Sequence, residues 1–128
     1  MNLLLDTHAF LWFVWKDPRL SNFARTLILD PKNVLLFSAA SYWEIAVKVS
    51  IGKLTLAEPF AIFMPREIVN NRLVILPIGL AHASAAAALP LHHRDPFDRM
   101  LIAQSIVEQA PLVSADRLFD PYGVTRLW

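Results

Sequence analysis

The chain has 128 residues, a formal net charge of +1, a hydrophobic fraction of 55% and no cysteine. This length predicts a single domain over residues 1–128, with a core of its own. The absence of cysteine excludes disulfides, thiolate nucleophiles and zinc–thiolate sites, and it is typical of a reducing compartment, so we expect a cytoplasmic protein. No apolar run reaches the roughly 18 residues of a membrane span, and Met1 is not followed by the basic segment of a signal peptide.

The first half of the chain alternates short apolar runs with segments of helical periodicity. The run that ends at Asp6 is apolar throughout, which predicts a buried, central and parallel strand. Serines stand where they can cap the helices that follow, and Gly52 is placed to end the third helix. The predicted elements are a strand Leu3–Asp6, a helix Thr7–Trp15, a helix capped by Ser21 with Phe23, Ala24, Leu27 and Ile28 on one face, a strand Val34–Phe37 and a helix opened by Ser38 or Ser41.

The second half continues this alternation. Its first helical segment is interrupted by Pro65, because proline breaks or kinks helices. Asp95 fits the N-cap of the longest helix, and Pro96 fits the first helical position, where a missing N–H costs nothing. The predicted elements are a helix Glu58–Asn70, a strand Leu73–Leu76, a helix Ala81–Leu89, a helix Pro96–Glu108, a strand Pro111–Ser114 and an edge strand Val124–Leu127.

Strands that alternate with helices predict an α/β fold with a mostly parallel sheet. Right-handed crossovers bring the carboxyl ends of parallel strands to one edge, and open α/β sheets bind their ligands there. Any one acid at such an edge is usually a turn former or a helix cap. Here, however, the order of the elements places four acids at the same edge, namely Asp6, Glu44, Asp98 and Asp116.

Several carboxylates in one cleft repel one another unless a cation neutralises them or some of them bind protons. Oxygen ligands without cysteine favour Mg²⁺ or Mn²⁺ over zinc. Such an ion polarises a phosphoryl oxygen and lowers the pKa of bound water. The sequence therefore favours metal-assisted hydrolysis of a phosphodiester. It contains no glycine-rich phosphate loop that would indicate a nucleotide cradle.

Four motifs of this chain resemble, in order and spacing, those of the PIN-domain ribonucleases, in particular the VapC-type toxins of bacterial toxin–antitoxin pairs. They span most of the chain and comprise Leu3–His8, Ser41–Lys48, Asp95–Gln104 and Leu112–Phe119. The resemblance implies a three-layer α/β/α PIN-like fold with a mostly parallel central sheet. It also implies an Mg²⁺- or Mn²⁺-dependent endoribonuclease that cleaves RNA with a metal-activated water, acts as the toxin of a type II toxin–antitoxin system, forms a dimer and is inhibited by a VapB-type antitoxin.

The resemblance assigns a role to individual residues of this chain. The acids that match the family's catalytic and metal-binding positions are Asp6, Glu44, Asp98 and Asp116. We interpret Asp95 as a helix cap or a supporting group and not as a primary ligand. Thr7 and Ser114 match small hydroxyl positions, from which each can orient a carboxylate or a metal-bound water.

With a net charge near zero, contacts with RNA must come from basic residues placed near the acids. The candidates are Lys48, His93, Arg94, Arg99 and Arg117. Two structural alternatives to RNA binding stay open. Lys48 can form an i,i+4 ion pair with Glu44, and the segment before Asp95 can be a solvated loop. The spacing of three indoles is typical of core or interface aromatics, and stacking on bases would need an exposed ring; they are Trp12, Trp15 and Trp43.

Two other functions are open at this point. A haloacid-dehalogenase-like phosphatase also opens with an apolar strand that ends in Asp, but it has a second Asp two residues later, where this chain has His8. A non-catalytic partner-binding domain with an acidic pocket, such as a response-regulator receiver, has an acceptor Asp at a later strand end. Here the later strands end at Ser38 and Pro77. The apolar residues of segments 10–15 and 23–29 predict a homodimer and a hydrophobic groove for an antitoxin segment.

Overall fold

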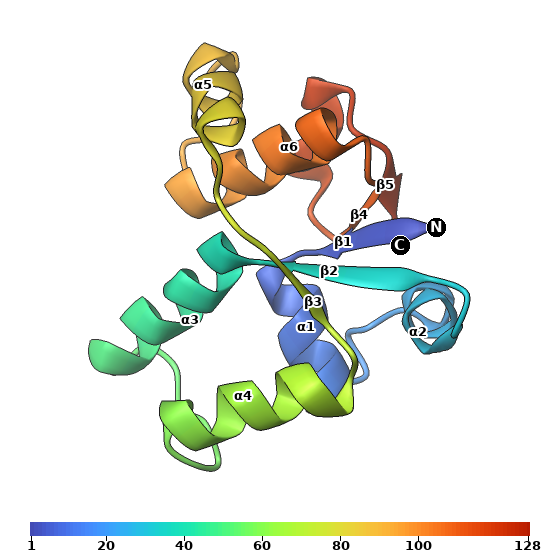
Figure 1. Ribbon diagram of the computed structural model, residues 1–128, viewed down its shortest axis with the longest axis vertical. Coiled ribbons are helices and arrows are strands. Elements are labelled where there is room, and N and C mark those ends of the chain that lie inside the picture. The colour runs from blue at the N-terminus through green and yellow to red at the C-terminus, as the bar shows by residue number, and fades with distance from the viewer.

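A five-stranded, wholly parallel sheet forms the centre of the computed structural model, which describes all residues 1–128 (Figure 1). The strands lie in the order β3-β2-β1-β4-β5. The first strand is central and parallel and the last lies at an edge, as predicted. The bounds of the strands are β1 (Asn2–Leu5), β2 (Val34–Ser38), β3 (Val74–Leu76), β4 (Leu112–Val113) and β5 (Arg126–Leu127).

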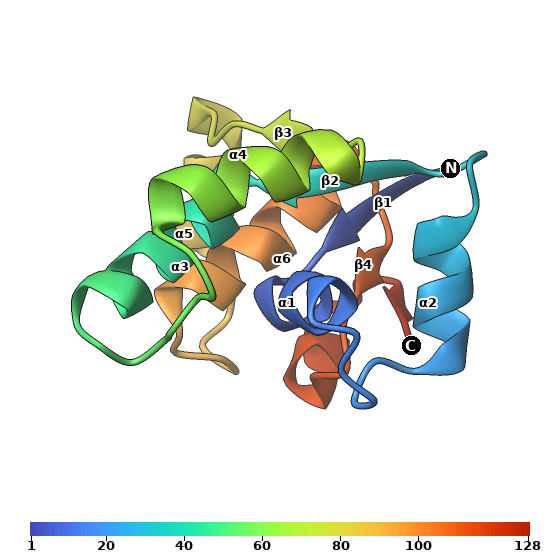
Figure 2. The same cartoon turned by 90° about the horizontal axis from the view of Figure 1, so that it is seen from below.

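Helices cover both faces of the sheet, which gives the predicted three layers (Figure 1), and Figure 2 shows the molecule from the side of α1, α2 and α4. Helices α1, α2 and α4 pack on one face, α6 packs on the other, and α5 packs on α6. Helix α3 contacts both α1 and α6. The bounds are α1 (Thr7–Val14), α2 (Asn22–Leu29), α3 (Ala39–Ser50), α4 (Phe60–Asn70), α5 (Leu80–Ala88), α6 (Pro96–Glu108) and a 3₁₀ helix η1 (Arg117–Tyr122) that the sequence analysis did not predict.

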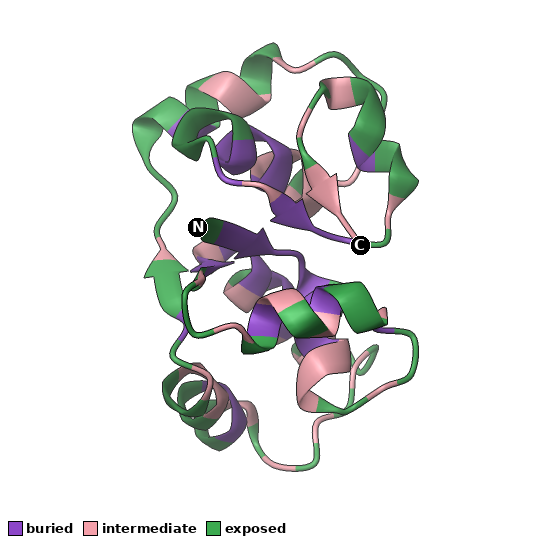
Figure 3. Ribbon diagram, turned by 90° about the vertical axis from the view of Figure 1, so that its right-hand side faces the viewer, coloured by how far each residue is buried: buried purple, intermediate pink, exposed green.

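Two hydrophobic cores lie on opposite faces of the sheet, because successive side chains of a strand point to opposite faces. In β1, Leu3 and Leu5 enter the larger core beneath α1, α2 and α4, whereas Leu4 enters the smaller core beneath α6. The central strands are therefore buried on both faces, which explains their continuous apolar sequence. Figure 3 shows buried residues along these strands and on the helix faces that cover them.

The caps of the helices follow the sequence signals closely. Ser21 and Ser38 are N-caps, each accepting a hydrogen bond from a backbone N–H of the first turn. Gly52 takes φ +76° just beyond α3, a left-handed conformation that glycine adopts without steric cost. The turn is closed by hydrogen bonds from the N–H of Gly52 to the carbonyl of Val49 and from that of Lys53 to the carbonyl of Lys48.

Two sequence predictions about the helices were wrong. Pro65 does not interrupt α4, which runs unbroken from Phe60 to Asn70. Pro65 and Ala61 are exposed, so water can reach the Ala61 carbonyl that loses its N–H partner. Phe23 does not join the buried face of α2, since its side chain is 51% exposed. None of the helices has the length and apolar character needed to cross a membrane.

The order of the strands determines where a site can form. β1 lies between β2 and β4. The strands β2 and β3 are added on one side of β1, and β4 and β5 are added on the other. At such a switch of sides, a crevice opens beyond the carboxyl ends of the neighbouring strands. Asp6 directly follows β1, and Ser114 directly follows β4. Both residues therefore stand at this crevice.

Candidate metal centre

Four acids gather beyond the carboxyl ends of β1 and β4, as the order of the elements predicted. Asp6 and Asp116 follow these strands, Glu44 lies in the second turn of α3, and Asp98 lies in the first turn of α6. The charges of the other three acids each raise the pKa of Asp98. The cluster combines residues that are up to 110 positions apart in the sequence, from Asp6 to Asp116.

Asp6 is held rigidly at the bottom of the site. One of its oxygens accepts a hydrogen bond from the N–H of Ala9 at 2.6 Å, and the other accepts one from the hydroxyl of Ser114. These bonds make Asp6 the N-cap of α1 and connect β1 to β4. Its side chain is buried, and this burial raises the pKa of its carboxyl. Ser114 thus orients a carboxylate, one of the two roles expected for it.

Glu44 is already partnered on both of its oxygens. The hydroxyl of Thr7 donates to Oε1 at 2.6 Å, and the ammonium of Lys48 lies 2.6 Å from Oε2. The i,i+4 ion pair that the sequence left open is therefore present. The positive charge of Lys48 offsets the negative charge of Glu44. Glu44 is therefore better placed to position Thr7 and Lys48 than to be the main ligand of a metal cation.

Asp98 has a strongly raised pKa. Burial, followed by the charges of Asp95, Glu44, Asp6 and Asp116, raises the pKa of its carboxyl to about 8. Asp95 itself is the N-cap of α6 and accepts hydrogen bonds from the N–H groups of Phe97 and Asp98. Asp95 therefore caps the helix, as predicted, whereas Asp98 lies three positions later and is partly buried among the other acids.

His93 is the residue whose placement the sequence did not indicate. Its Nε2 lies 3.0 Å from Asp98 Oδ2 and 3.5 Å from Asp116 Oδ2, although neither contact has the alignment of a hydrogen bond. Its Nδ1 accepts the N–H of Asp95, and its ring stacks on Phe119. The three side chains His93, Asp98 and Asp116 can direct ligand atoms to within 4.8 Å of one another.

Tyr122 of η1 holds the loop that carries His93. Its hydroxyl accepts the N–H groups of His92 and His93 at 3.0 and 2.6 Å, and it donates to the carbonyl of Pro90 at 2.9 Å. The segment before Asp95 is thus a loop in which His92 and Arg94 are exposed, but the side chain of His93 is largely buried. It is fixed beside the acids, where it cannot act as a freely moving phosphate contact.

The other basic candidates divide into two groups. Arg99 donates to four backbone carbonyls, which closes the loop between α5 and α6 and leaves few donors for RNA. Arg94 and Arg117 are exposed and make no ion pair. They are the two predicted RNA contacts that remain free beside the acids.

The residues fit a hard divalent cation. Asp98 carries a partly desolvated carboxylate with no hydrogen-bond donor assigned to it, next to Asp116 and the buried Asp6. Carboxylate oxygens are the ligands that Mg²⁺ and Mn²⁺ prefer. A cation held by Asp6, Asp98 and Asp116 would offset the burial and the carboxylate repulsion that together raise the pKa of Asp98.

In the metal-free protein, we expect the Asp98→Asn variant to have a higher melting temperature than the wild type at pH 8. Asp98 has a folded-state pKa of about 8 against a reference of 3.8, so the native state binds its proton more tightly. Stability therefore falls as pH rises from about 4 to 8. The advantage of the variant should shrink as the pH is lowered toward 5. Thermal unfolding in EDTA across this range tests the expectation, and a constant difference would contradict it.

The fold is an open, parallel α/β sheet with acids at its carboxyl edge, which is where such sheets bind their ligands. The PIN domain family model matches residues 3–124 of this chain. The chain therefore belongs to the PIN domain family, as the four sequence motifs indicated.

One curated relative that the chain resembles is Ribonuclease VapC16 of Mycobacterium tuberculosis (strain ATCC 25618 / H37Rv). The two are 37% identical over 75 residues, which cover 56% of this chain and 52% of the relative. The chain thus spans about half the length of the curated relative that it matches.

Solved structures share the whole fold. VapBC2 from Rickettsia felis, bound to a DNA fragment from its promoter, superposes with a TM-score of 0.72 at 18% identity, covering 99% of this chain and 98% of that chain. VapBC-1 from nontypeable Haemophilus influenzae gives a TM-score of 0.66 at 14% identity, covering 99% and 97%. At these identities the likeness establishes the fold alone.

Proposed function

We propose that this chain, folded as one domain over residues 1–128, is a metal-dependent endoribonuclease and the toxin of a type II toxin–antitoxin pair. The observation that carries the proposal is that Asp98 and Asp116 direct ligand atoms to within 4.8 Å of each other in a PIN-domain chain, where the charge of Asp6 also acts on Asp98. The similarity of the chain to Ribonuclease VapC16 supports the proposal, and so does the fold that it shares with the VapBC2 structure. The proposal includes a cytoplasmic location, because the expected substrate is cellular RNA.

Each residue of the site has a defined task in this proposal. Asp6, Asp98 and Asp116 would hold Mg²⁺ or Mn²⁺, with Glu44 as a further acid beside them. When bound, such an ion supplies an activated water and neutralises the phosphate charge. Ser114 fixes the Asp6 carboxylate, and Thr7 and Lys48 fix Glu44.

His93 is placed to influence the site through its neighbours. Because Nδ1 accepts the Asp95 N–H, the neutral imidazole carries its hydrogen on Nε2, beside the Asp98 and Asp116 carboxylates. Arg94 and Arg117 are free to contact the RNA backbone. Arg99 holds the loop that carries His93 and so acts indirectly.

Cleavage of a long RNA by the purified protein tests the function. Activity is expected with Mg²⁺ or Mn²⁺ and not with EDTA, and products should carry a 5′-phosphate because a water, and not the 2′-hydroxyl, attacks the phosphorus. Single-stranded and loop regions should be cut first, since their nucleotides can be splayed into a cleft. Cleavage that persists in EDTA, or that leaves a 2′,3′-cyclic phosphate, would reject the proposal.

The phosphatase alternative is not favoured by the site. The residue two positions after Asp6 is His8, and its ring lies against Trp12, 5.6 Å between centroids. No second carboxylate therefore stands at the position that such a phosphatase uses. The non-catalytic alternative predicts that partner binding survives when every acid is neutralised, whereas cleavage should not.

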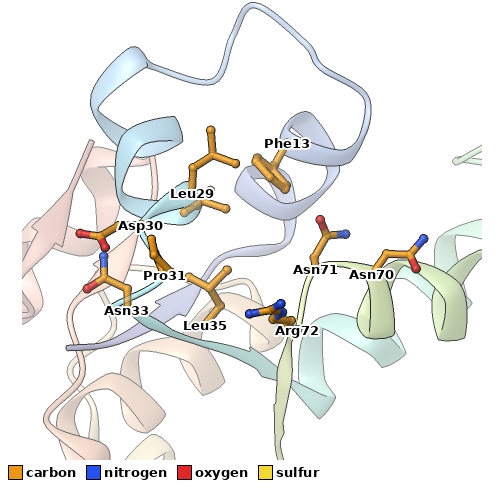
Figure 4. A pocket seen from close by; sticks show the side chains of 10 residues that line it. Phe13, Leu29, Asp30, Pro31, Asn33, Leu35, Asn70, Asn71 and Arg72 are labelled. Atoms are coloured by element: carbon orange, nitrogen blue, oxygen red, sulfur yellow. The ribbon is translucent and has the colours of Figure 1, made fainter.

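An antitoxin segment would fit the hollow between α1, α2 and α4. Figure 4 shows Phe13 and Leu29 facing Leu35 and Arg72 across a pocket of about 250 Å³. A second hollow continues from it and shares Phe13, Leu29 and Asn71. Phe23 and Leu29 on α2 are exposed nearby, so this region offers the apolar surface that an amphipathic segment needs.

A homodimer would use a different surface from the one that the sequence suggested. The edge strand β3 and the segment after it expose large apolar side chains, including Val74, Ile75, Ile78 and Leu80. An exposed apolar edge strand is a template for pairing with a second chain. We expect Ile75→Lys to convert a dimer into a monomer in sedimentation, while a wild type that sediments as a monomer at micromolar concentration would count against the dimer.

A further inference from the structure

A cavity beside the acid cluster has the composition of a nucleic-acid subsite. It lies between α1, α3 and the turn that follows α3, and its volume is about 360 Å³. Its lining combines aromatic rings, cations and a few aliphatic side chains, and it includes no carboxylate: Thr7, His8, Leu11, Trp12, Trp15, Arg19, Ile45, Lys48, Lys53 and Leu54.

The cavity adjoins the acid site through two shared residues. Thr7 and Lys48 line the cavity, and both also bond the carboxylate of Glu44. Glu44 with its two partners is therefore the wall between the cavity and the acids. If one phosphate of a nucleic-acid strand lies at the acid cluster, the adjacent nucleotide of that strand therefore lies beside this cavity.

Three cations line this cavity and no carboxylate lines it. By contrast, Asp30 lines the hollow that includes Arg72, and Glu67 lines the hollow that includes Lys16 and Arg25. Here Lys53 is exposed and makes no ion pair. Arg19 and Lys48 are paired with Asp17 and Glu44, so Lys53 supplies the uncompensated charge.

Three aromatic side chains line the cavity, and Trp12 lies between two neighbours. The guanidinium of Arg19 lies 4.9 Å from the centre of the Trp12 ring, and the His8 ring lies 5.6 Å from it. Trp12 is thus covered by its neighbours. His8 is exposed and the Trp15 side chain is 39% exposed, so these two rings offer faces to a ligand. Bases stack on such rings irrespective of sequence.

We propose that this cavity binds a nucleotide that flanks the scissile phosphate of single-stranded RNA, with Trp15 and His8 contacting the base and Lys53 contacting the phosphate. The inference rests on the proposed nuclease function and extends it by locating a substrate subsite. An unpaired strand is the form that fits, because its bases are free to leave their neighbours and stack on protein rings.

Fluorescence anisotropy of a short fluorescein-labelled single-stranded RNA in EDTA tests the subsite, with gels confirming that the RNA stays intact. Trp15→Ala should weaken binding about 5- to 150-fold, the range for losing one base–aromatic stack. Lys53→Gln should reduce the slope of log affinity against log salt by about 0.7, the value for one phosphate contact on a single strand.

Matched controls separate this effect from general changes. Lys32→Gln removes one exposed positive charge before β2, at the opposite edge of the sheet, and Phe23→Ala removes an exposed aromatic ring of α2 that lines no part of the cavity. Both should bind RNA like the wild type. If Trp15→Ala and Lys53→Gln also bind like the wild type while the wild type still cleaves RNA, the subsite is wrong and the nuclease function stands.

Two further outcomes would also overturn the subsite. A wild type that neither binds nor cleaves RNA removes the nuclease function, and the subsite with it. If polyglutamate competes with the RNA, and if Lys53→Gln weakens both ligands while Trp15→Ala weakens neither, the cavity receives an acidic protein segment and not a nucleotide.

Discussion

Asp98→Asn should reduce RNA cleavage by more than about 100-fold, since even residues that only support metal ligands cost 10- to 100-fold when mutated. The substitution keeps the size of the side chain and removes the carboxylate whose pKa the other acids raise. Asp6→Asn should have a similar effect, because Asp6 is buried next to Ser114 and has no mobile alternative. Initial rates on a long RNA at saturating Mn²⁺ measure both effects.

Asp95→Asn is the matched control for this experiment. It lies three positions before Asp98 and makes the same acid-to-amide change, but asparagine is also a good N-cap. Its side chain accepts the N–H groups of Phe97 and Asp98, and an amide oxygen can accept them too. Circular dichroism should show that all three variants are folded. An Asp95 variant as inactive as the Asp98 variant would mean that the wrong acid of the pair was assigned to the metal.

Features that depend on neighbours in the sequence were predictable. Asp95 and Pro96 mark the start of α6, and Ser38 marks the start of α3, because cap signals act within one turn. The convergence of the acids was also predictable, since a parallel sheet brings the carboxyl ends of its strands to one edge. These rules located Asp6, Glu44, Asp98 and Asp116 without any knowledge of tertiary contacts.

The placement of His93 could not be predicted in the same way. It depends on Tyr122, which is 29 positions away and holds the loop from a 3₁₀ helix that has no apolar periodicity. The role of Arg99 is hidden for a related reason, because its partners are backbone carbonyls, which every residue possesses. A sequence pattern reports which side chains are available but not which carbonyls a folded loop will present.

The exposure of the aromatic residues could not be predicted from the sequence either. Trp12 is half-buried and Trp15 and Trp43 are exposed, although their spacing allows core, interface or solvent positions. Which face of α1 is covered depends on where the loop after it returns. That loop carries Arg19 back over Trp12, and this contact creates the cavity beside the acids.

The apparent affinity for Mg²⁺ or Mn²⁺ should increase about tenfold per pH unit from pH 6 to 8, and level off above pH 8, because the metal must displace the proton of Asp98. Burial and the neighbouring carboxylates raise the pKa of Asp98 to about 8, so below this pH the metal-free site is protonated. Burial also raises the pKa of Asp6, which acts in the same direction. Isothermal titration calorimetry with Mn²⁺ across this range measures the slope.

Calorimetry in two buffers of different ionisation enthalpy counts the protons that metal binding releases. At pH 7 the wild type should release about one proton or more per ion, since a group with a pKa of about 8 is mostly protonated there. Asp98→Asn should bind more weakly and release fewer protons, whereas Asp30→Asn, in the turn before β2, should match the wild type. Equal affinity at pH 6 and pH 8, with no proton released by the wild type, would show that Asp98 is ionised before the metal arrives. The carboxylate repulsion at this site would then be relieved in the free protein by its own cations, and the argument for a metal from these acids would fail.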